Sequence, residues 1–127
     1  MEYGYGKETN LSFADAVARV KEALAAEGFG VLTEIDVKKT MKEKIGADYD
    51  DYVILGACNP AFADRALRAE REVGLLLPCN VIVYQDGGAV RVSAIIPSAA
   101  MGMVDNPALA DLAREVESRL RAAIEAV

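Results

Sequence analysis

Histidine and tryptophan are both absent from this sequence of 127 residues, and only 6% of the residues are aromatic. Without histidine, the chain cannot carry a Ser-His-Asp triad, a Cys-His nucleophile pair or an imidazole metal ligand. It also has no side chain whose ordinary pKa lies close to neutral pH. These absences remove many common catalytic plans, and the remaining residues form no recognisable catalytic motif. The sequence therefore favours a protein that is not an enzyme.

Positive charge is also in the minority, with 14 Lys and Arg against 20 Asp and Glu, which gives a net charge of −6. Nucleic-acid binding needs a basic stripe, and binding to anionic lipid needs a polybasic segment. The sequence therefore predicts no nucleic-acid partner and no membrane partner. The longest uncharged runs, among them Val92 to Val104, are thirteen residues long. A membrane-spanning helix needs about 20 apolar residues.

The first eight residues, Met1 to Glu8, lack the apolar core of a signal peptide. We therefore expect a cytoplasmic protein whose two cysteines are reduced thiols. Hydrophobic residues make up 53% of the chain and charged residues 27%, which is ordinary globular composition. No linker, charge run or repeat divides the sequence, so we expect a single domain over residues 1–127.

Apolar spacing and breaker residues predict an alternation of strands and helices. The expected strands are a short one around Tyr3 and Tyr5, then 31–37, 52–57, 81–84 and 90–96, with a hairpin turn at 86–88. The expected helices are 12–27, 37–45, 60–73 and 107–125, and a loop over 97–106 precedes the last helix. Asn59-Pro60 and Asn106-Pro107 are the clearest helix starts, because Asn is a preferred N-cap and Pro is favoured at N1.

The order of these elements favours an α+β fold with helices packed on one face of a mostly antiparallel sheet. Period-two alternation assigns the strand faces. One face of the strand over 31–37 should carry Val31, Thr33, Ile35 and Val37. The inner face of the return strand after the hairpin should carry Val90, Val92, Ala94 and Ile96. Gly74 should end the helix that begins at Pro60.

Two Cys-Asn dipeptides, Cys58-Asn59 and Cys79-Asn80, flank the helix expected over 60–73. In the first interpretation, both cysteines are small buried residues and both asparagines satisfy backbone groups. In the second, the thiols cycle to a disulfide, helped by the helix N-terminus that follows Cys58. In the third, both thiolates bind a soft metal such as Cu(I) or Zn(II). No standard zinc or redox motif has this spacing, so the three interpretations stay open.

The loop over residues 97–106 is uncharged until Asp105 and contains Met101 and Met103, whose thioethers suit a Cu(I) site. Such a loop is long for a compact domain. It therefore suggests a lid or a dimer contact, besides a plain packed crossover.

The two Cys-Asn segments, Gly56–Pro60 and Gly74–Val81, together with Gly28–Val37, resemble the bacterial and archaeal domain-of-unknown-function family 302. The resemblance runs over essentially the whole chain. It implies an α+β domain similar to one repeat of the TATA-box-binding-protein-like fold, with a curved sheet and helices on one side. It also implies a homodimer, and it implies no established activity. The fold's DNA-binding role is not transferred to this acidic chain.

The chain departs from the family pattern at two positions. Family members often have a His in the helix after Asn-Pro, where this chain has Asp64. Many have an acidic or amide residue before the Pro that closes the last strand, where this chain has Ile96-Pro97. The site candidates that remain are Cys58, Asn59, Cys79 and Asn80. We expect a homodimeric binding domain with a ligand site around them and no cofactor; a thiol-redox or soft-metal protein is the alternative.

Overall fold

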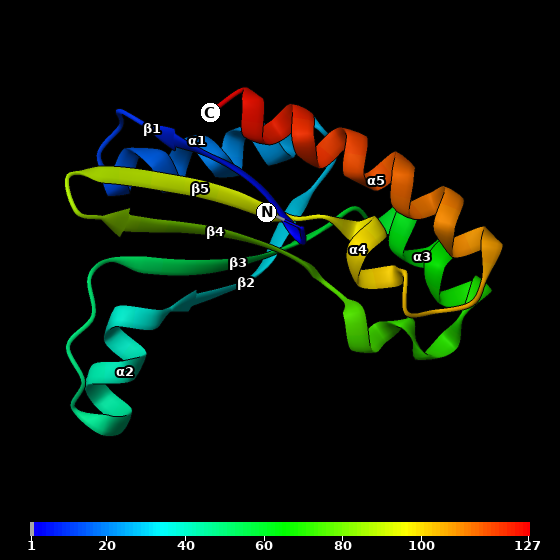
Figure 1. Cartoon of the computed structure of the whole chain (residues 1–127), viewed down its shortest axis with the longest axis horizontal. Coiled ribbons are helices and arrows are strands. Elements are labelled where there is room, and N and C mark those ends of the chain that lie inside the picture. The colour runs from blue at the N-terminus through cyan, green and yellow to red at the C-terminus, as the bar shows by residue number, and fades with distance from the viewer. Residues whose placement is uncertain (1) are drawn as a thin grey trace.

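The computed structural model describes residues 2–127, whose strands, α-helices and one short 3-10 helix are shown in Figure 1. In chain order the elements are β1 (Gly4–Thr9), α1 (Phe13–Ala26), β2 (Gly30–Asp36), α2 (Val37–Ile45), β3 (Tyr52–Cys58), α3 (Pro60–Ala69), η1 (Arg71–Leu76), β4 (Cys79–Asp86), β5 (Ala89–Ile95), α4 (Pro97–Met101) and α5 (Pro107–Glu125). No helix among the described residues is long and apolar enough to cross a membrane.

The five strands form one sheet in the order β1-β5-β4-β3-β2, and every neighbouring pair is antiparallel. Helices α1 and α5 lie together on one side of this sheet (Figure 1). The α+β fold expected from the sequence is therefore confirmed. The β4–β5 hairpin is confirmed as well, with Gly87 at its turn in the left-handed region at φ 59°, where glycine carries no Cβ penalty.

The main core lies between the sheet and the helices α1 and α5. Alternate residues of the three inner strands point into it, as period-two alternation requires. The buried strand residues are Val53, Leu55, Ala57, Val81, Val83, Val90, Val92 and Ala94, and they pack against Val20 and Leu24 of α1 and Leu120 and Ile124 of α5. Burying an aliphatic side chain of this size contributes about 1.5–3 kcal/mol. Burial of these residues holds the helices on this face.

Within residues 2–127, the opposite face of the sheet carries no helix layer of this kind. Its residues come from the alternate positions of the same strands, including Tyr52 and Ile54 on β3 and Ile82 and Tyr84 on β4, all partly exposed. The rings of Tyr52 and Tyr84 stack with centroids 5.2 Å apart. Only one face of the sheet is therefore buried within the described chain.

Strand β2 differs from the expected pattern. A β-bulge interrupts its pairing with β3 between Val31 and Thr33, so alternation does not continue through Leu32. Val31 pairs with Ala57 and packs against the core, whereas Ile35 pairs with Ile54 on the uncovered face. The prediction that both residues share one face is wrong, because the inserted residue reverses the side on which later residues lie.

Three other boundaries correct the sequence predictions. The helix that begins at Pro60 ends at Ala69 and not at Gly74, because Glu70 is extended (φ −151°) and η1 follows. This break lets Val73 become buried. Strand β5 ends at Ile95, so Ile96 is the N-cap residue of α4 and not an inner-face residue. The expected loop over 97–106 begins with that helix.

Helix α2 projects from the body at the end of β2, away from α1 and α5 (Figure 1). Asp36 caps it by accepting a hydrogen bond from the Lys39 amide at 3.0 Å, and Gly46 ends it with φ 67°. None of its residues is buried, and Ile45 is 72% exposed. The helix carries four lysines and one glutamate, in a chain of net charge −6. Two of these lysines are paired within the chain, because Lys38 Nζ lies 3.6 Å from Asp51 and Lys42 Nζ lies 2.9 Å from Asp48.

At Gly56 two side chains from neighbouring segments lie across strand β3: Thr33 from β2 and Pro78 from the segment before β4. A Cβ at this position would meet Thr33 Oγ1 and would lie 2.7 Å from Pro78 Cγ. The missing side chain therefore lets both residues sit directly on the strand. By contrast, a Cβ at Gly30, at the start of β2, would meet no atom within 4 Å.

We expect Gly56→Ala to lower the free energy of unfolding by about 1–3 kcal/mol, because the new methyl group overpacks this crossing. Gly30→Ala is the matched control and should change it by no more than about 0.5 kcal/mol. Chemical denaturation of both variants measures the difference. Equal stability of the two variants would contradict the close approach at Gly56.

Candidate functional site

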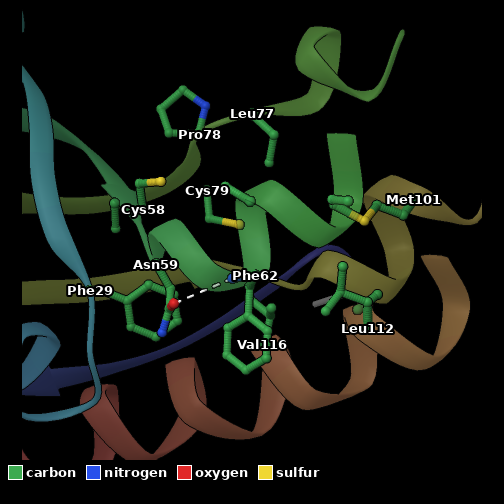
Figure 2. A pocket seen from close by; sticks show the side chains of 14 residues that line it. Phe29, Cys58, Asn59, Phe62, Leu77, Pro78, Cys79, Met101, Leu112 and Val116 are labelled. Atoms are coloured by element: carbon green, nitrogen blue, oxygen red, sulfur yellow. Dashed lines mark hydrogen bonds between the residues drawn. The ribbon is translucent and has the colours of Figure 1, made fainter. Parts of the chain in front are cut away.

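A small apolar pocket lies where β3 ends and β4 begins, between these strand ends, α3, α4 and α5 (Figure 2). Its cavity volume is about 30 Å³. The pocket is lined by Phe29, Ala57, Cys58, Asn59, Phe62, Ala63, Ala66, Leu77, Pro78, Cys79, Met101, Leu112, Ala113 and Val116. Three of the four candidate residues from the sequence, Cys58, Asn59 and Cys79, therefore share one pocket.

Local sequence positions the first Cys-Asn pair. Cys58 is the last residue of β3, and Asn59 follows as the N-cap of α3. The Asn59 Oδ1 atom accepts a hydrogen bond from the Phe62 amide at 3.4 Å, and Pro60 occupies the first turn. The asparagine thus takes the capping role expected from the Asn-Pro sequence. Cys58 lies directly before the N-terminus of this helix.

Strand register brings the second cysteine beside the first. Cys79 is the first residue of β4, and it pairs with Ala57, the neighbour of Cys58. Figure 2 shows the Cys58 side chain directed toward the turn at Pro78 and Cys79. Both cysteines are free thiols; Cys79 is buried and Cys58 is partly exposed. The helix between them and the return through η1 therefore bring the two thiols into one pocket.

Asn80, the fourth candidate residue, lies elsewhere. It is exposed, pairs with Gly56 and lines the uncovered face of the sheet. Period-two alternation explains this position, because Asn80 follows a residue that points toward the helices. The two Cys-Asn dipeptides are therefore not equivalent: the first contributes both side chains to the pocket, and the second contributes only its thiol.

Burial controls the chemistry of Cys79. It raises the pKa of this thiol from its ordinary value of 9.0 to about 11, and the neighbouring Cys58 thiol adds to the increase. An apolar environment disfavours the thiolate. Cys79 therefore remains protonated at neutral pH unless a bound cation replaces its proton.

Met101 is the third sulfur-bearing residue of the pocket. It ends α4 and is buried, whereas Met103 is 77% exposed. Helix α4 is attached to α5 through Ser98, whose Oγ donates a hydrogen bond of 2.5 Å to Glu117 Oε1. This hydrogen bond is the largest cause of the lowered pKa of the Glu117 carboxyl group. Of the two methionines considered from the sequence, only Met101 reaches the pocket.

The donors around this pocket are few. Among residues 2–127, no group of three or more His, Cys, Asp or Glu side chains is placed to hold a metal ion. Asp64 does not line the pocket; it is paired with Arg68 at 3.0 Å on the exposed surface of α3. A cavity of about 30 Å³ has room for one ion or about one water molecule. Organic ligands occupy pockets of about 300–1,000 Å³.

A second, larger hollow lies on the uncovered face of the sheet. Its volume is about 430 Å³, and it is lined by Tyr3, Gly4, Tyr52, Asn80, Ile82, Tyr84, Ser93, Ala94 and Ile95. Sequence reasoning missed it as a site. The signal was present in the alternating residues of β3 and β4, where Tyr52, Ile54, Ile82 and Tyr84 give the outward face an apolar character.

Comparisons with known proteins agree with the resemblance drawn from the Cys-Asn segments. The model of the family described as "Domain of unknown function DUF302" matches residues 5–127. A crystal structure of an uncharacterized conserved DUF302 protein from Bacillus stearothermophilus is similar at 34% identity and a TM-score of 0.91. The match covers 97% of this chain and 96% of that one. No curated protein matches the sequence.

The raised pKa of Cys79 makes stability depend on pH. The unfolded chain releases the thiol proton near pH 9.0 and the folded chain near pH 11. The stabilisation is present in full below pH 9 and is lost as the pH rises toward 11, an effect of about 2–3 kcal/mol. In denaturant unfolding, the Cys58→Ser variant should have a lower free energy of unfolding at pH 11 than at pH 9. The matched Cys58→Ser/Cys79→Ser variant should lack it, and parallel pH profiles would contradict the assignment.

Proposed function

The chain belongs to the DUF302 family, a family of domains of unknown function, and from that premise we propose that it is a homodimeric binding domain. Two parts make up this proposal. The uncovered face of the sheet binds a second copy of the chain, and the pocket at Cys58, Asn59 and Cys79 takes a small ligand. The observation that carries the proposal is the uncovered sheet face.

A β-sheet with apolar residues on both faces is stable in water when a second layer covers each face. Helices α1 and α5 supply one layer, and the uncovered face has none of comparable size. That face carries the Tyr52–Tyr84 stack beside Ile82, and farther out Tyr3 and Ile35, which are 66% and 47% exposed. Contiguous exposed apolar residues of this kind mark interaction surfaces.

A second copy of this chain is the partner that best fits this face. In a two-fold dimer each subunit presents the same patch, so an apolar sheet face meets an identical one at a separation of about 10 Å. Two lysines of the projecting helix α2 pair with Asp51 and Asp48 of their own chain. The other two, Lys39 and Lys44, are exposed and can pair with carboxylates of a second subunit of net charge −6.

The ligand part of the proposal rests on the pocket that Cys58, Asn59 and Cys79 share. Its apolar walls and two thiols suit a ligand of one or two atoms. The thiol-redox alternative has the proximity of the cysteines in its favour. However, a disulfide needs Cβ vectors that face each other. Cys79 pairs with Ala57, not with Cys58, and residues offset by one position leave a regular ladder on opposite faces.

We therefore expect no intramolecular disulfide under mild oxidation. Intact-mass measurement after treatment with diamide, with unreacted thiols counted by alkylation, should find both thiols free. Denatured protein under the same conditions is the control, because its cysteines are released from the strand geometry and can pair. A loss of two hydrogens within the folded chain would support the redox alternative instead.

The homodimer is tested by introducing charge on the uncovered face. Ile82→Glu should convert the dimer to a monomer, because a carboxylate at the centre of an apolar interface loses its hydration. Light scattering coupled to size exclusion measures the molar mass, and far-UV circular dichroism confirms that the variant is folded. Leu67→Glu on α3, where Leu67 is 43% exposed, is the matched control and should remain dimeric. A monomeric wild-type protein would refute the proposed dimer.

A further inference from the structure

We propose that helix α2 is an exchanged arm: in the homodimer, the apolar stripe of α2 on each subunit packs into an apolar groove beside η1 on the partner subunit. The inference rests on the proposed homodimer and deepens it. It states which segments meet outside the sheet face and how the two subunits are oriented. The Cys58 pocket takes no part in it.

Helix α2 has an apolar side that its own chain does not cover. Val37, Met41 and Ile45 recur at intervals of four residues, so they lie on one face of the helix. None of them is buried, and Ile45 is 72% exposed. A helix of nine residues is marginal in water unless tertiary packing covers its apolar face. The caps at Asp36 and Gly46 stabilise the ends of α2 but leave this stripe open, so a surface from outside the chain is needed to cover it.

A second apolar feature lies beside η1, where β4 begins and β5 ends. It is a groove with a volume of about 230 Å³. Leu75 of η1 lines this groove and is 84% exposed. The groove shares Asn80 and Ile95 with the hollow on the uncovered face, so it continues that face past the end of the strands. Its other lining residues include Leu76, Leu77, Pro97, Ala100 and Met101.

The arm and the groove lie at opposite ends of the sheet. Helix α2 lies near the start of β3, where Lys38 Nζ is 3.6 Å from Asp51, the residue before Tyr52. The groove lies at the other end of β3, where Cys79 pairs with Ala57. Figure 1 shows α2 at one end of the strands and η1, the green segment between α3 and β4, at the other end.

A two-fold axis that crosses the strands near Ile82 exchanges these two ends. Ile82 lies two residues from Tyr84, at the end near α2, and two residues from Asn80, at the end near the groove. When two sheet faces meet around such an axis, the α2 end of each subunit lies over the groove end of the other. The contact is made twice, as a two-fold dimer requires. The arm therefore extends the sheet-face interface on both sides.

Charge favours this orientation over the alternative one. Lys44 on α2 and Glu72 in the first turn of η1 are both exposed. Neither forms a salt bridge within residues 2–127, so both are available to a partner. An axis parallel to the strands would instead place the two α2 helices at the same end, with Lys39 and Lys44 of each subunit facing like charges. The crossing axis places the lysine of the arm near the glutamate of the groove.

Sedimentation equilibrium of the full chain tests the proposal. Ile45→Glu and Leu75→Glu should each raise the Kd of the dimer by at least about tenfold, because a carboxylate replaces a buried apolar contact. Met103→Glu is the matched control, since Met103 is 77% exposed and lies outside the groove. It should leave the Kd within about twofold of the wild-type value. All three positions are exposed in the single chain, and circular dichroism verifies that each variant is folded.

A charge-reversal pair tests the contact itself. Lys44→Glu and Glu72→Lys should each raise the Kd about threefold, the scale of an exposed ion pair. Lys44→Glu/Glu72→Lys should restore the wild-type Kd, because opposite charges again face each other across the interface. Lys44→Glu/Asp105→Lys has the same net charge but places the new lysine on an exposed residue outside the groove, so it should not restore the Kd.

The outcomes separate this inference from the proposed dimer. A dimer that Ile82→Glu breaks, and that Ile45→Glu and Leu75→Glu leave intact, overturns the exchanged arm and retains the sheet-face interface. A dimer that Ile45→Glu and Leu75→Glu break, and that Ile82→Glu leaves intact, supports the arm and overturns the sheet face as the main contact. If the charge-reversed double variant is no tighter than its single variants, the pairing of α2 with η1 is wrong. A monomeric wild-type protein overturns both.

Discussion

The antiparallel pairing of β3 with β4 determines both candidate sites of this molecule. One register places Cys79 opposite Ala57, and so beside Cys58, at the end of the sheet near α3. The same register places Tyr84 opposite Tyr52 and Ile82 opposite Ile54 on the uncovered face. Because side chains alternate along a strand, a shift of one residue would turn the thiol of Cys79 away from the core. It would also turn Tyr84 toward the helices.

Two features keep this register in place. The inner face of the pair is aliphatic and fully buried, with Leu55, Val81 and Val83 each at 0% exposure. On the other face, Gly56 leaves space for Thr33 and Pro78 to cross the strand. Burial of the aliphatic face supplies the free energy that holds the register. The space at Gly56 allows the turn before Cys79 to lie close to the sheet. The pocket is therefore a product of ordinary core packing beside one glycine.

Much of the fold could be predicted from the sequence, because its signals are local. Asn59-Pro60 and Asn106-Pro107 start helices through bonds within the first turn, and Gly28 and Gly46 follow helices with positive φ. The errors occur where tertiary packing overrides a local pattern. The break at Glu70 buries Val73, and the bulge at β2 places Val31 and Ile35 on opposite faces. The proximity of Cys58 to Cys79 depends on strand register, which no local pattern encodes. Their role as a ligand site remains a prediction.

The central claim is that the uncovered sheet face is an interface between two copies of this chain. It is tested most directly by isotope-filtered NMR on a mixture of labelled and unlabelled protein. The account predicts intermolecular contacts between the methyl groups of Ile54 or Ile82 and the rings of Tyr52 or Tyr84. Intermolecular contacts that involve only α1, α5 or α3, or none at all, would contradict it.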